Sequence, residues 1–201
     1  MQELDERIEQ DRKRDLARLL ADLTAMTPRR FREICDPIHS AALRDFRYEE
    51  GRGAYITGRV GAGKTVLSFF LAREMIKRGL VHRSGIYGND SRPILRVSAV
   101  EMVIDFQNFD KGHDLSERLA TYKFRNLLMI DDFGTEKLTD FVYQCIYEVL
   151  NKRYEQMLPT IITSNKNLQD LDERIASRIS EACDVIALSG GDLRLKGVVG
   201  R

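Results

Sequence analysis

The chain has 201 residues, of which 43% are hydrophobic and 31% charged. This composition supports one domain of ordinary size plus a short extension. Its 32 basic residues nearly balance 31 acidic ones, so net charge does not indicate nucleic-acid binding, and any DNA contact requires a local patch. A charged N-terminus and the lack of a long apolar run predict a cytoplasmic protein without membrane contact. Three widely spaced cysteines outside any C-x-x-C pattern predict buried, reduced thiols at Cys35, Cys145 and Cys183.

The first segment, residues 2–26, is predicted to form a helix. Charges of both signs fill most of its positions, while its apolar residues recur at helical spacing. That stripe consists of Leu4, Ile8, Leu16, Leu19, Leu20 and Leu23. Helical periodicity does not say which surface receives the stripe. The helix therefore either lies on its own domain or docks against a partner.

A small basic cluster follows the break at Pro28. Arg29, Arg30 and Arg32 surround Phe31 just upstream of the first expected core strand. Such a cluster is either solvated surface, or it borders a nucleotide base or a phosphate backbone. A second helix is expected over Pro37–Arg47.

The most informative stretch reads GRVGAGKT at residues 58–65 and fits the pattern G-x-x-x-x-G-K-[ST]. An apolar strand, Ala54–Thr57, precedes it, and a helix, Val66–Arg78, follows it. This context favours a phosphate-binding loop over an ordinary glycine-rich turn. We expect Lys64 to reach the β- and γ-phosphates of ATP and the Thr65 hydroxyl to ligate Mg²⁺. The predicted nucleotide-binding residues are Gly58, Arg59, Val60, Gly61, Ala62, Gly63, Lys64, Thr65 and Val66.

The next segment is predicted to contain a loop or small hairpin over Val81–Pro93 and then a strand, Ile94–Ser98. Helices are expected over Val100–Phe109 and over residues 114–123. A crossover between two parallel strands needs only one helix. The second helix is therefore either structural or part of a functional insertion.

Leu127–Ile130 is an apolar run that ends in two adjacent acids, Asp131 and Asp132. A buried strand that delivers carboxylates to its carboxyl end suits a ligand site in an α/β sheet. This Walker B pattern predicts that Asp131 holds Mg²⁺ and that Asp132 orients or deprotonates the attacking water. The alternative is that the two acids cap a helix.

The remaining elements complete a parallel α/β fold with five core strands. A helix is expected over Asp140–Met157, and the strand Thr160–Thr163 then delivers Ser164 and Asn165 to the same edge. Asn165 either bonds the attacking water or the γ-phosphate, or it caps the next helix. A helix over Leu171–Ala182 carries Arg174 and Arg178 one turn apart, and Asp184–Leu188 is the last strand.

Taken together, these residues resemble the AAA+ ATPases of the DnaC/IstB type, which include bacterial and phage helicase loaders and transposition helper ATPases. The resemblance extends from about Thr27 to Arg194. The motifs that carry it are GRVGAGKT at 58–65, LLMIDDFG at 127–134, RYE at 153–155, ITSN at 162–165, ERIASRI at 173–179 and GGDLR at 190–194. It implies an AAA+ core at residues 27–201 and a possible partner-docking helix at residues 1–26. The 13 residues after Leu188 (201 − 188) leave no room for a helical lid.

The resemblance also implies roles that spacing alone does not give. Asn165 matches the sensor-1 polar residue, and Arg194 matches the sensor-2 arginine. Arg178 matches the arginine finger that completes the site of a neighbouring subunit, with Arg174 as the fallback. The helices between Ser98 and Asn126 fall where relatives carry an insertion that faces single-stranded DNA. In that insertion Phe109 and Lys111 are the best candidates for contact.

The function implied is ATP-dependent loading of a hexameric replicative helicase by an oligomer that self-associates with ATP and contacts DNA, expected to be single-stranded. The small size of the protein favours a phage or prophage origin. The alternative within the family is a transposition helper that assembles on double-stranded DNA and recruits a transposase. The segment before the loop is shorter than the helicase-binding domain of many loaders, which leaves this choice open. Two further alternatives are a small-molecule kinase, for which no acceptor-binding signature is found, and a nucleotide switch without turnover.

Overall fold

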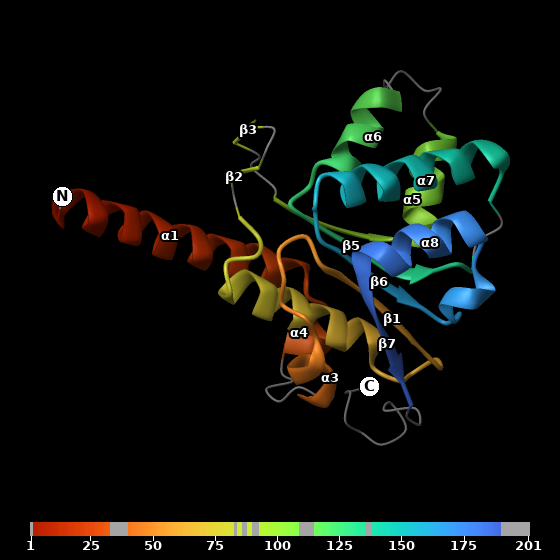
Figure 1. Ribbon diagram of the computed structural model, residues 1–201, viewed down its shortest axis with the longest axis horizontal. Helices are drawn as coiled ribbons and strands as arrows, with labels where there is room; N and C mark the ends of the chain where they lie inside the picture. Colours follow the sequence, from red (N-terminus) through yellow and green to blue (C-terminus); the bar gives the residue numbers. More distant parts are fainter. Residues whose placement is uncertain are drawn as a thin grey trace.

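A five-stranded parallel sheet forms the centre of the computed structural model (Figure 1). The structure describes residues 2–32, 40–82, 84–85, 88–89, 93–108, 115–135 and 138–189. The strand order is β4-β5-β6-β1-β7, and every neighbouring pair is parallel. The strands are β1 (Gly53–Gly58), β4 (Ile94–Ser98), β5 (Leu127–Phe133), β6 (Thr160–Ser164) and β7 (Cys183–Leu188). The prediction of five parallel core strands is confirmed.

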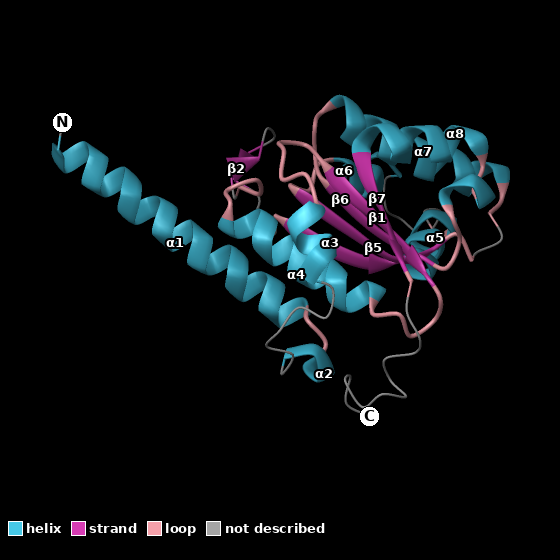
Figure 2. Ribbon diagram, turned by 60° about the horizontal axis from the view of Figure 1, so that its bottom comes forward, coloured by secondary structure: helices cyan, strands magenta, loops and turns pink. Residues whose placement is uncertain are grey.

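Helices cover both faces of this sheet and enclose two cores (Figure 2). One core lies between the sheet and α1 (Gln2–Met26), α2 (Arg29–Arg32), α3 (Ser40–Asp45) and α4 (Lys64–Lys77). The other lies beneath α5 (Ala99–Gln107), α6 (Leu115–Lys123), α7 (Asp140–Glu155) and α8 (Glu173–Ala182). A short 3-10 helix, η1 (Leu168–Asp170), links β6 to α8, and β2 (Ser84–Gly85) and β3 (Gly88–Asn89) form a small antiparallel hairpin. Among the described residues, no helix combines the length and apolar character needed to cross a membrane.

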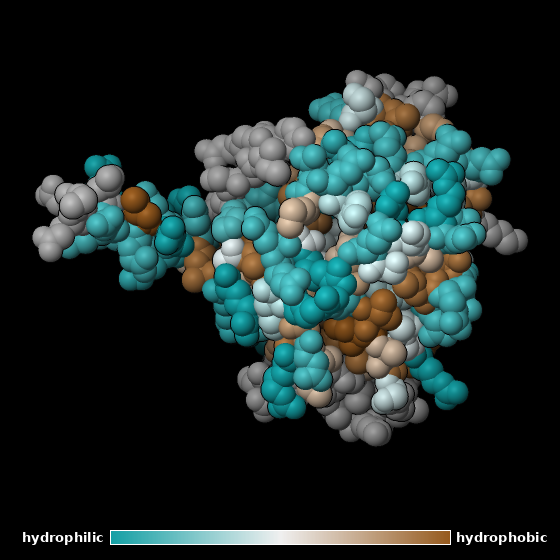
Figure 3. All heavy atoms as spheres, viewed as in Figure 1, coloured by the Kyte–Doolittle hydropathy of each residue, from teal (hydrophilic) through white to brown (hydrophobic). Residues whose placement is uncertain are grey.

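The first helix, α1, has two halves with different surroundings. Leu19 and Leu23 are buried in the core against α4, and Leu16 and Leu20 pack beside them. Residues 5–14 are all exposed, and this half projects from the body of the molecule (Figure 1). Figure 3 shows the projecting half as mostly hydrophilic. The part of the stripe from Leu16 to Leu23 therefore lies on its own domain, whereas Ile8 is exposed in the charged half.

Element boundaries differ from the sequence prediction where capping residues intervene. The α8 helix begins at Glu173 rather than Leu171, because the Asp172 carboxylate accepts the Arg174 N–H at 3.0 Å. The α5 helix begins at Ala99 because Ser98 and Glu101 form a reciprocal capping box. The helix expected over Pro37–Arg47 is described only as Ser40–Asp45 and ends there.

Two arginine-centred clusters hold the ends of the strands opposite the glycine-rich loop, which we call the amino edge. Arg153 of α7 is 1% exposed, and its guanidinium donates to four backbone carbonyls and one hydroxyl. Burial lowers the pKa of Arg153 to about 9. The second cluster joins Asp184 to Arg47 and Arg52, with Nε–Oδ1 distances of 2.9 and 3.0 Å. These polar groups fix where β5, β6 and β7 begin.

Candidate active site

The glycine-rich loop connects β1 to α4 at the carboxyl ends of the strands, which we call the carboxyl edge. Gly61 and Gly63 have φ values of 80° and 90°, in the left-handed region that favours glycine. This path turns the chain so that α4 begins at Lys64. The positive end of a 14-residue helix therefore faces the loop, an arrangement suited to an anion.

The Lys64 side chain lies along the loop and is 9% exposed. Its Nζ donates to the carbonyl oxygens of Gly58 and Arg59 at 2.8 and 2.9 Å, and to Asn165 Oδ1 at 2.7 Å. These acceptors carry no full negative charge. An anion entering the loop can therefore exchange for them at Lys64.

Asn165 connects Lys64 to the second acid of the Walker B pair. While its oxygen accepts from Lys64, its Nδ2 donates to Asp132 Oδ1 at 2.6 Å. Asp132 has φ of 60°, an uncommon conformation for a residue with a side chain, and its N–H donates to Thr163 Oγ1 at 2.9 Å. The caps of η1 and α8 are Asn167 and Asp172, so Asn165 caps neither helix.

The first acid, Asp131, lies at the end of β5 and has three side-chain partners. Thr65 and Thr163 donate their hydroxyls to Oδ1 at 3.0 and 2.6 Å. Arg96 of β4 donates to Oδ2 at 2.8 Å. Both acids belong to the strand, so the alternative that they cap a helix is wrong.

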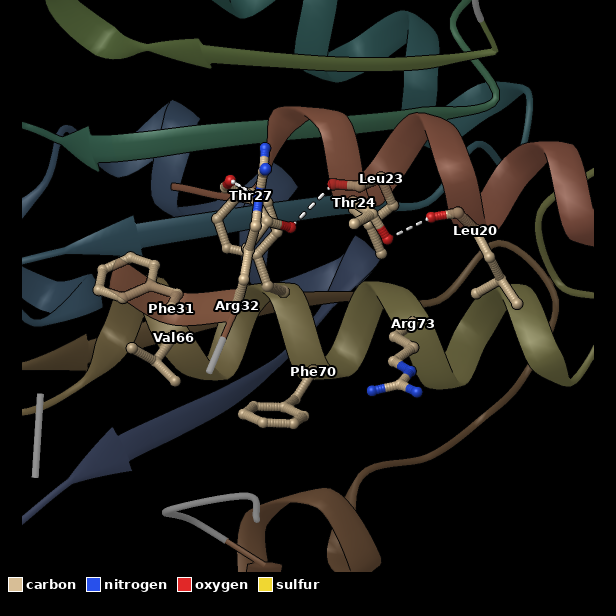
Figure 4. Close-up of a pocket in the computed structure, with 10 residues that line it drawn as sticks. Leu20, Leu23, Thr24, Thr27, Phe31, Arg32, Val66, Phe70 and Arg73 are labelled. Atoms are coloured by element: carbon tan, nitrogen blue, oxygen red, sulfur yellow. Dashed lines mark hydrogen bonds between the residues drawn. The ribbon is translucent and has the colours of Figure 1, made fainter. Parts of the chain in front are cut away.

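These groups meet in one cavity of about 290 Å³. Its lining residues are Arg30, Phe31, Val60, Gly61, Gly63, Lys64, Thr65, Val66, Asp131, Asp132, Thr163 and Asn165. An apolar cavity of about 220 Å³ between α1, α2 and α4 shares Phe31 and Val66 with it. Figure 4 shows the Phe31 ring beside the Val66 side chain, at the end of this apolar cavity. Arg30 and Phe31 therefore border the loop cavity while Arg30 is also exposed, a position compatible with both sequence interpretations.

The oxygen donors at Asp131 suit a magnesium ion that is held mainly by a nucleotide. Thr65 and Asp131 offer a hydroxyl and a carboxylate within 3.0 Å of each other. Within the described ranges, no group of three or more His, Cys, Asp or Glu side chains could hold a metal ion. Mg²⁺ commonly binds through one or two protein oxygens plus phosphates and water, so the residues present fit it.

The two arginines expected to act between subunits lie on α8, which covers the face of the sheet opposite α4. Arg174 Cζ lies 4.5 Å from the centre of the Tyr147 ring, and Arg178 Nη1 lies 2.7 Å from Glu181 Oε2. Hydrogen bonding with Tyr147 raises the pKa of Arg178 above its ordinary value. The described lining of the loop cavity includes neither arginine. Arg194, Phe109, Lys111 and Cys35 lie outside the described residues.

Sequence reasoning missed two residues of this site, Arg96 and Thr163. Thr163 belongs to the ITSN motif but was assigned only to a strand. Arg96 offered a signal of its own, since a charged residue in the middle of a short apolar strand (ILRVS) needs a partner.

The sequence profile of the IstB-like ATP-binding proteins matches residues 31–197. The chain belongs to this family. It is 31% identical over 148 residues to the replicative helicase loader DnaI of Bacillus subtilis, a match that covers 69% of this chain and 44% of DnaI. An insertion-sequence ATP-binding protein of Geobacillus stearothermophilus is 26% identical over 122 residues, covering 61% and 43% of the two chains. The chain thus spans less than half the length of these two curated relatives.

Solved structures agree on the fold of this family member. The DnaC helicase loader superposes with a TM-score of 0.55 at 22% identity, covering 75% of this chain and 85% of DnaC. Domain III of the Thermotoga maritima replication initiation protein DnaA superposes with a TM-score of 0.60 at 19% identity, covering 86% of this chain and 72% of that domain. At these identities the likeness concerns the fold, which is that of a P-loop AAA+ core.

Proposed function

We propose that this protein binds and hydrolyses ATP at the carboxyl edge and uses that cycle to load a replicative DNA helicase. The observation that carries the ATPase proposal is the continuous set of contacts from Lys64 through Asn165 to Asp132, beside the Thr65–Asp131 pair. An anion-binding loop, a sensor amide and two acids thus converge on one cavity. This combination supports phosphoryl transfer to water.

In this proposal each residue has a defined role. The loop from Gly58 to Val66 surrounds the phosphates, Lys64 contacts the β- and γ-phosphates, and Phe31 borders the base. Asp132 orients the attacking water or takes its proton, and Asn165 keeps that carboxylate in place. Thr65 and Asp131 would hold Mg²⁺, which supplies charge neutralisation on the phosphates when it is bound.

We further propose that hydrolysis requires assembly, because Arg178 lies away from the cavity of its own subunit. The finger would act on a neighbouring subunit, and Arg194 would contact the nucleotide as sensor 2.

Arg178→Ala should retain nucleotide binding but lose most turnover, by about 1,000-fold. Turnover should recover when Arg178→Ala is mixed with Lys64→Ala, since each variant supplies what the other lacks. Recovery no greater than the sum of the separate activities would contradict a finger in trans. Arg174→Ala serves as the comparison at the fallback position.

The client is proposed to be a hexameric replicative helicase, with single-stranded DNA as the second ligand. The similarity to DnaI, a replicative helicase loader, supports this choice. The similarity to an insertion-sequence ATP-binding protein supports the alternative, a transposition helper on double-stranded DNA. The exposed half of α1 is the part of residues 1–26 proposed to contact the client.

The first experiment measures the masses of the species that form when the protein is mixed with its host helicase, with and without ATP. A variant that lacks residues 2–14 removes only the projecting half of α1 and leaves the leucines in the core. A discrete complex that this truncation abolishes is the expected result. ATP-dependent oligomers on double-stranded DNA without a helicase complex would instead favour the transposition helper.

A further inference from the structure

Arg96 is a cation within the candidate site to which the proposed ATPase roles assign no task. Arg96 lies on β4, two residues before Ser98, which is the residue that pairs with Asp131 on β5. The Arg96 side chain therefore extends towards Asp131 on the neighbouring strand. Nη2 lies 2.8 Å from Asp131 Oδ2. The Arg96 side chain is 30% exposed and that of Asp131 is 21% exposed. Solvent ions can therefore reach the pair.

The position of Arg96 is set by the packing of α4. Leu95 and Val97 point into the core beneath α5 and α7, so the alternation of a strand places Arg96 on the face that α4 covers. Its Cζ lies 5.5 Å from the centre of the Phe69 ring of α4. A guanidinium over an aromatic face is weakly attracted to it, which holds the side chain beside Asp131.

Asp131 has hydrogen-bond donors without Arg96. Its Oδ1 accepts from both Thr65 and Thr163, at 3.0 and 2.6 Å. The same Thr65–Asp131 pair is the one proposed to hold the divalent cation. A metal at that position would lie within a few ångströms of the Arg96 guanidinium, and like charges at such a distance oppose each other.

We propose that Arg96 is a built-in competitor of the divalent cation: it neutralises Asp131 in the nucleotide-free site and lowers the affinity of that site for the metal. The metal then binds well only when phosphate charges enter with it. This inference rests on the proposed function in assigning the metal to Asp131. It makes Arg96 a positioning residue that links metal binding to nucleotide binding.

A second acid, Glu101, interacts electrostatically with Arg96. Glu101 of α5 accepts the N–H and the hydroxyl of Ser98, both at 2.8 Å. These hydrogen bonds are the main reason why the pKa of Glu101 lies below its ordinary value, and the charge of Arg96 adds to the effect. Glu101 thus attracts the Arg96 guanidinium in addition to Asp131.

The test is a titration with Mn²⁺, followed through the EPR signal of the free ion, first with the protein alone and then with a saturating non-hydrolysable ATP analogue. Arg96→Gln should lower the half-saturating Mn²⁺ concentration by at least about fivefold, the size of a modest coupling between two sites. Arg96→Lys keeps the charge and should stay within about twofold of wild type. In the Arg96→Gln background, Asp131→Asn should abolish the gain.

The matched control is Arg118→Gln. It removes another partly exposed Arg–Asp pair, Arg118–Asp105 at 3.2 Å, on the opposite face of the sheet. An unchanged or raised half-saturating concentration in Arg96→Gln would overturn the inference, as would equal shifts in the Gln and Lys variants. The measurement without nucleotide separates the two proposals. If wild type binds no ATP analogue while Arg96→Gln still gains Mn²⁺ affinity through Asp131, the ATPase proposal and the link to nucleotide fail, whereas the competition between Arg96 and the metal stands.

Discussion

The two edges of the sheet both contain a cation surrounded by neutral acceptors, yet they differ in what those acceptors can do. At the amino edge, Arg153 is 1% exposed, and its carbonyl acceptors belong to the end of α6 and to the residues that lead into β5 and β6. At the carboxyl edge, Lys64 bonds to loop carbonyls and to Asn165, which line a cavity. A ligand can replace the partners of Lys64 without unfolding anything. Arg153 itself is buried, so a ligand cannot replace its partners without opening the core.

Between the two edges, the larger effect is expected at the carboxyl edge. Lys64→Ala should lower ATP turnover by at least about 100-fold, because one preorganised donor to a charged transition state is worth that much. Its midpoint of thermal unfolding should change little, since the acceptors it leaves can bond to water in the cavity. The control is Lys77→Ala at the other end of α4, where Lys77 pairs with the partly exposed Glu74. Turnover near wild type in Lys64→Ala would remove the basis for the site.

The second effect tests the amino edge and should appear in stability. Arg153→Ala removes the guanidinium donor to the carbonyls of Tyr122 and Arg125 and one of the two donors to that of Pro159. We therefore expect a loss of about 3 kcal/mol or more in the free energy of unfolding. Chemical denaturation measures it. Arg153→Lys keeps a charge but lacks the several donors of the planar guanidinium, so its loss of unfolding free energy should be intermediate. At a temperature where both variants are folded, nucleotide affinity should match wild type. A selective loss of affinity would contradict the contrast between the edges.

The smallest effect concerns Asp184 at the same edge. Burial alone would raise its pKa, but hydrogen bonds from Arg47 and Arg52 outweigh it and hold the pKa of Asp184 below its ordinary value. The stabilisation is therefore complete above the unfolded-state pKa of about 4 and is lost as the pH falls through the folded-state pKa. Asp184→Asn should be less stable than wild type at pH 7, by less than Arg153→Ala. The difference should shrink on acidification, and a gap that is constant with pH would refute the assignment.

Much of this fold could be predicted because each central strand is a short apolar run between polar segments. Leu127–Ile130 is buried throughout, and the loop motif places α4 within two residues. The strand order could not be predicted in this way. Arg96 meets Asp131 only because β4 lies beside β5, a lateral relation that periodicity along the chain does not encode.

The role of Arg153 was unpredictable for a related reason. In the sequence it is one of several charged residues at the end of an amphipathic helix. Only the folded junction of α6, β5 and β6 reveals that carbonyls from two separate segments, residues 122–125 and Pro159, accept from one guanidinium. The cysteines were simpler: Cys145 and Cys183 are buried free thiols, as predicted from their number and spacing.

The divided surroundings of α1 also determine a length. At about 1.5 Å per residue, residues 2–15 extend about 20 Å beyond the leucines that fix the helix to the domain. Whatever contacts the tip is thereby held well clear of the cavity. The fixed part packs against α4, whose first residue is Lys64. A sideways force on the tip would therefore rotate α1 about Leu19 and Leu23. The helix that opposes this rotation is α4, and the glycine-rich loop lies at the first residue of α4.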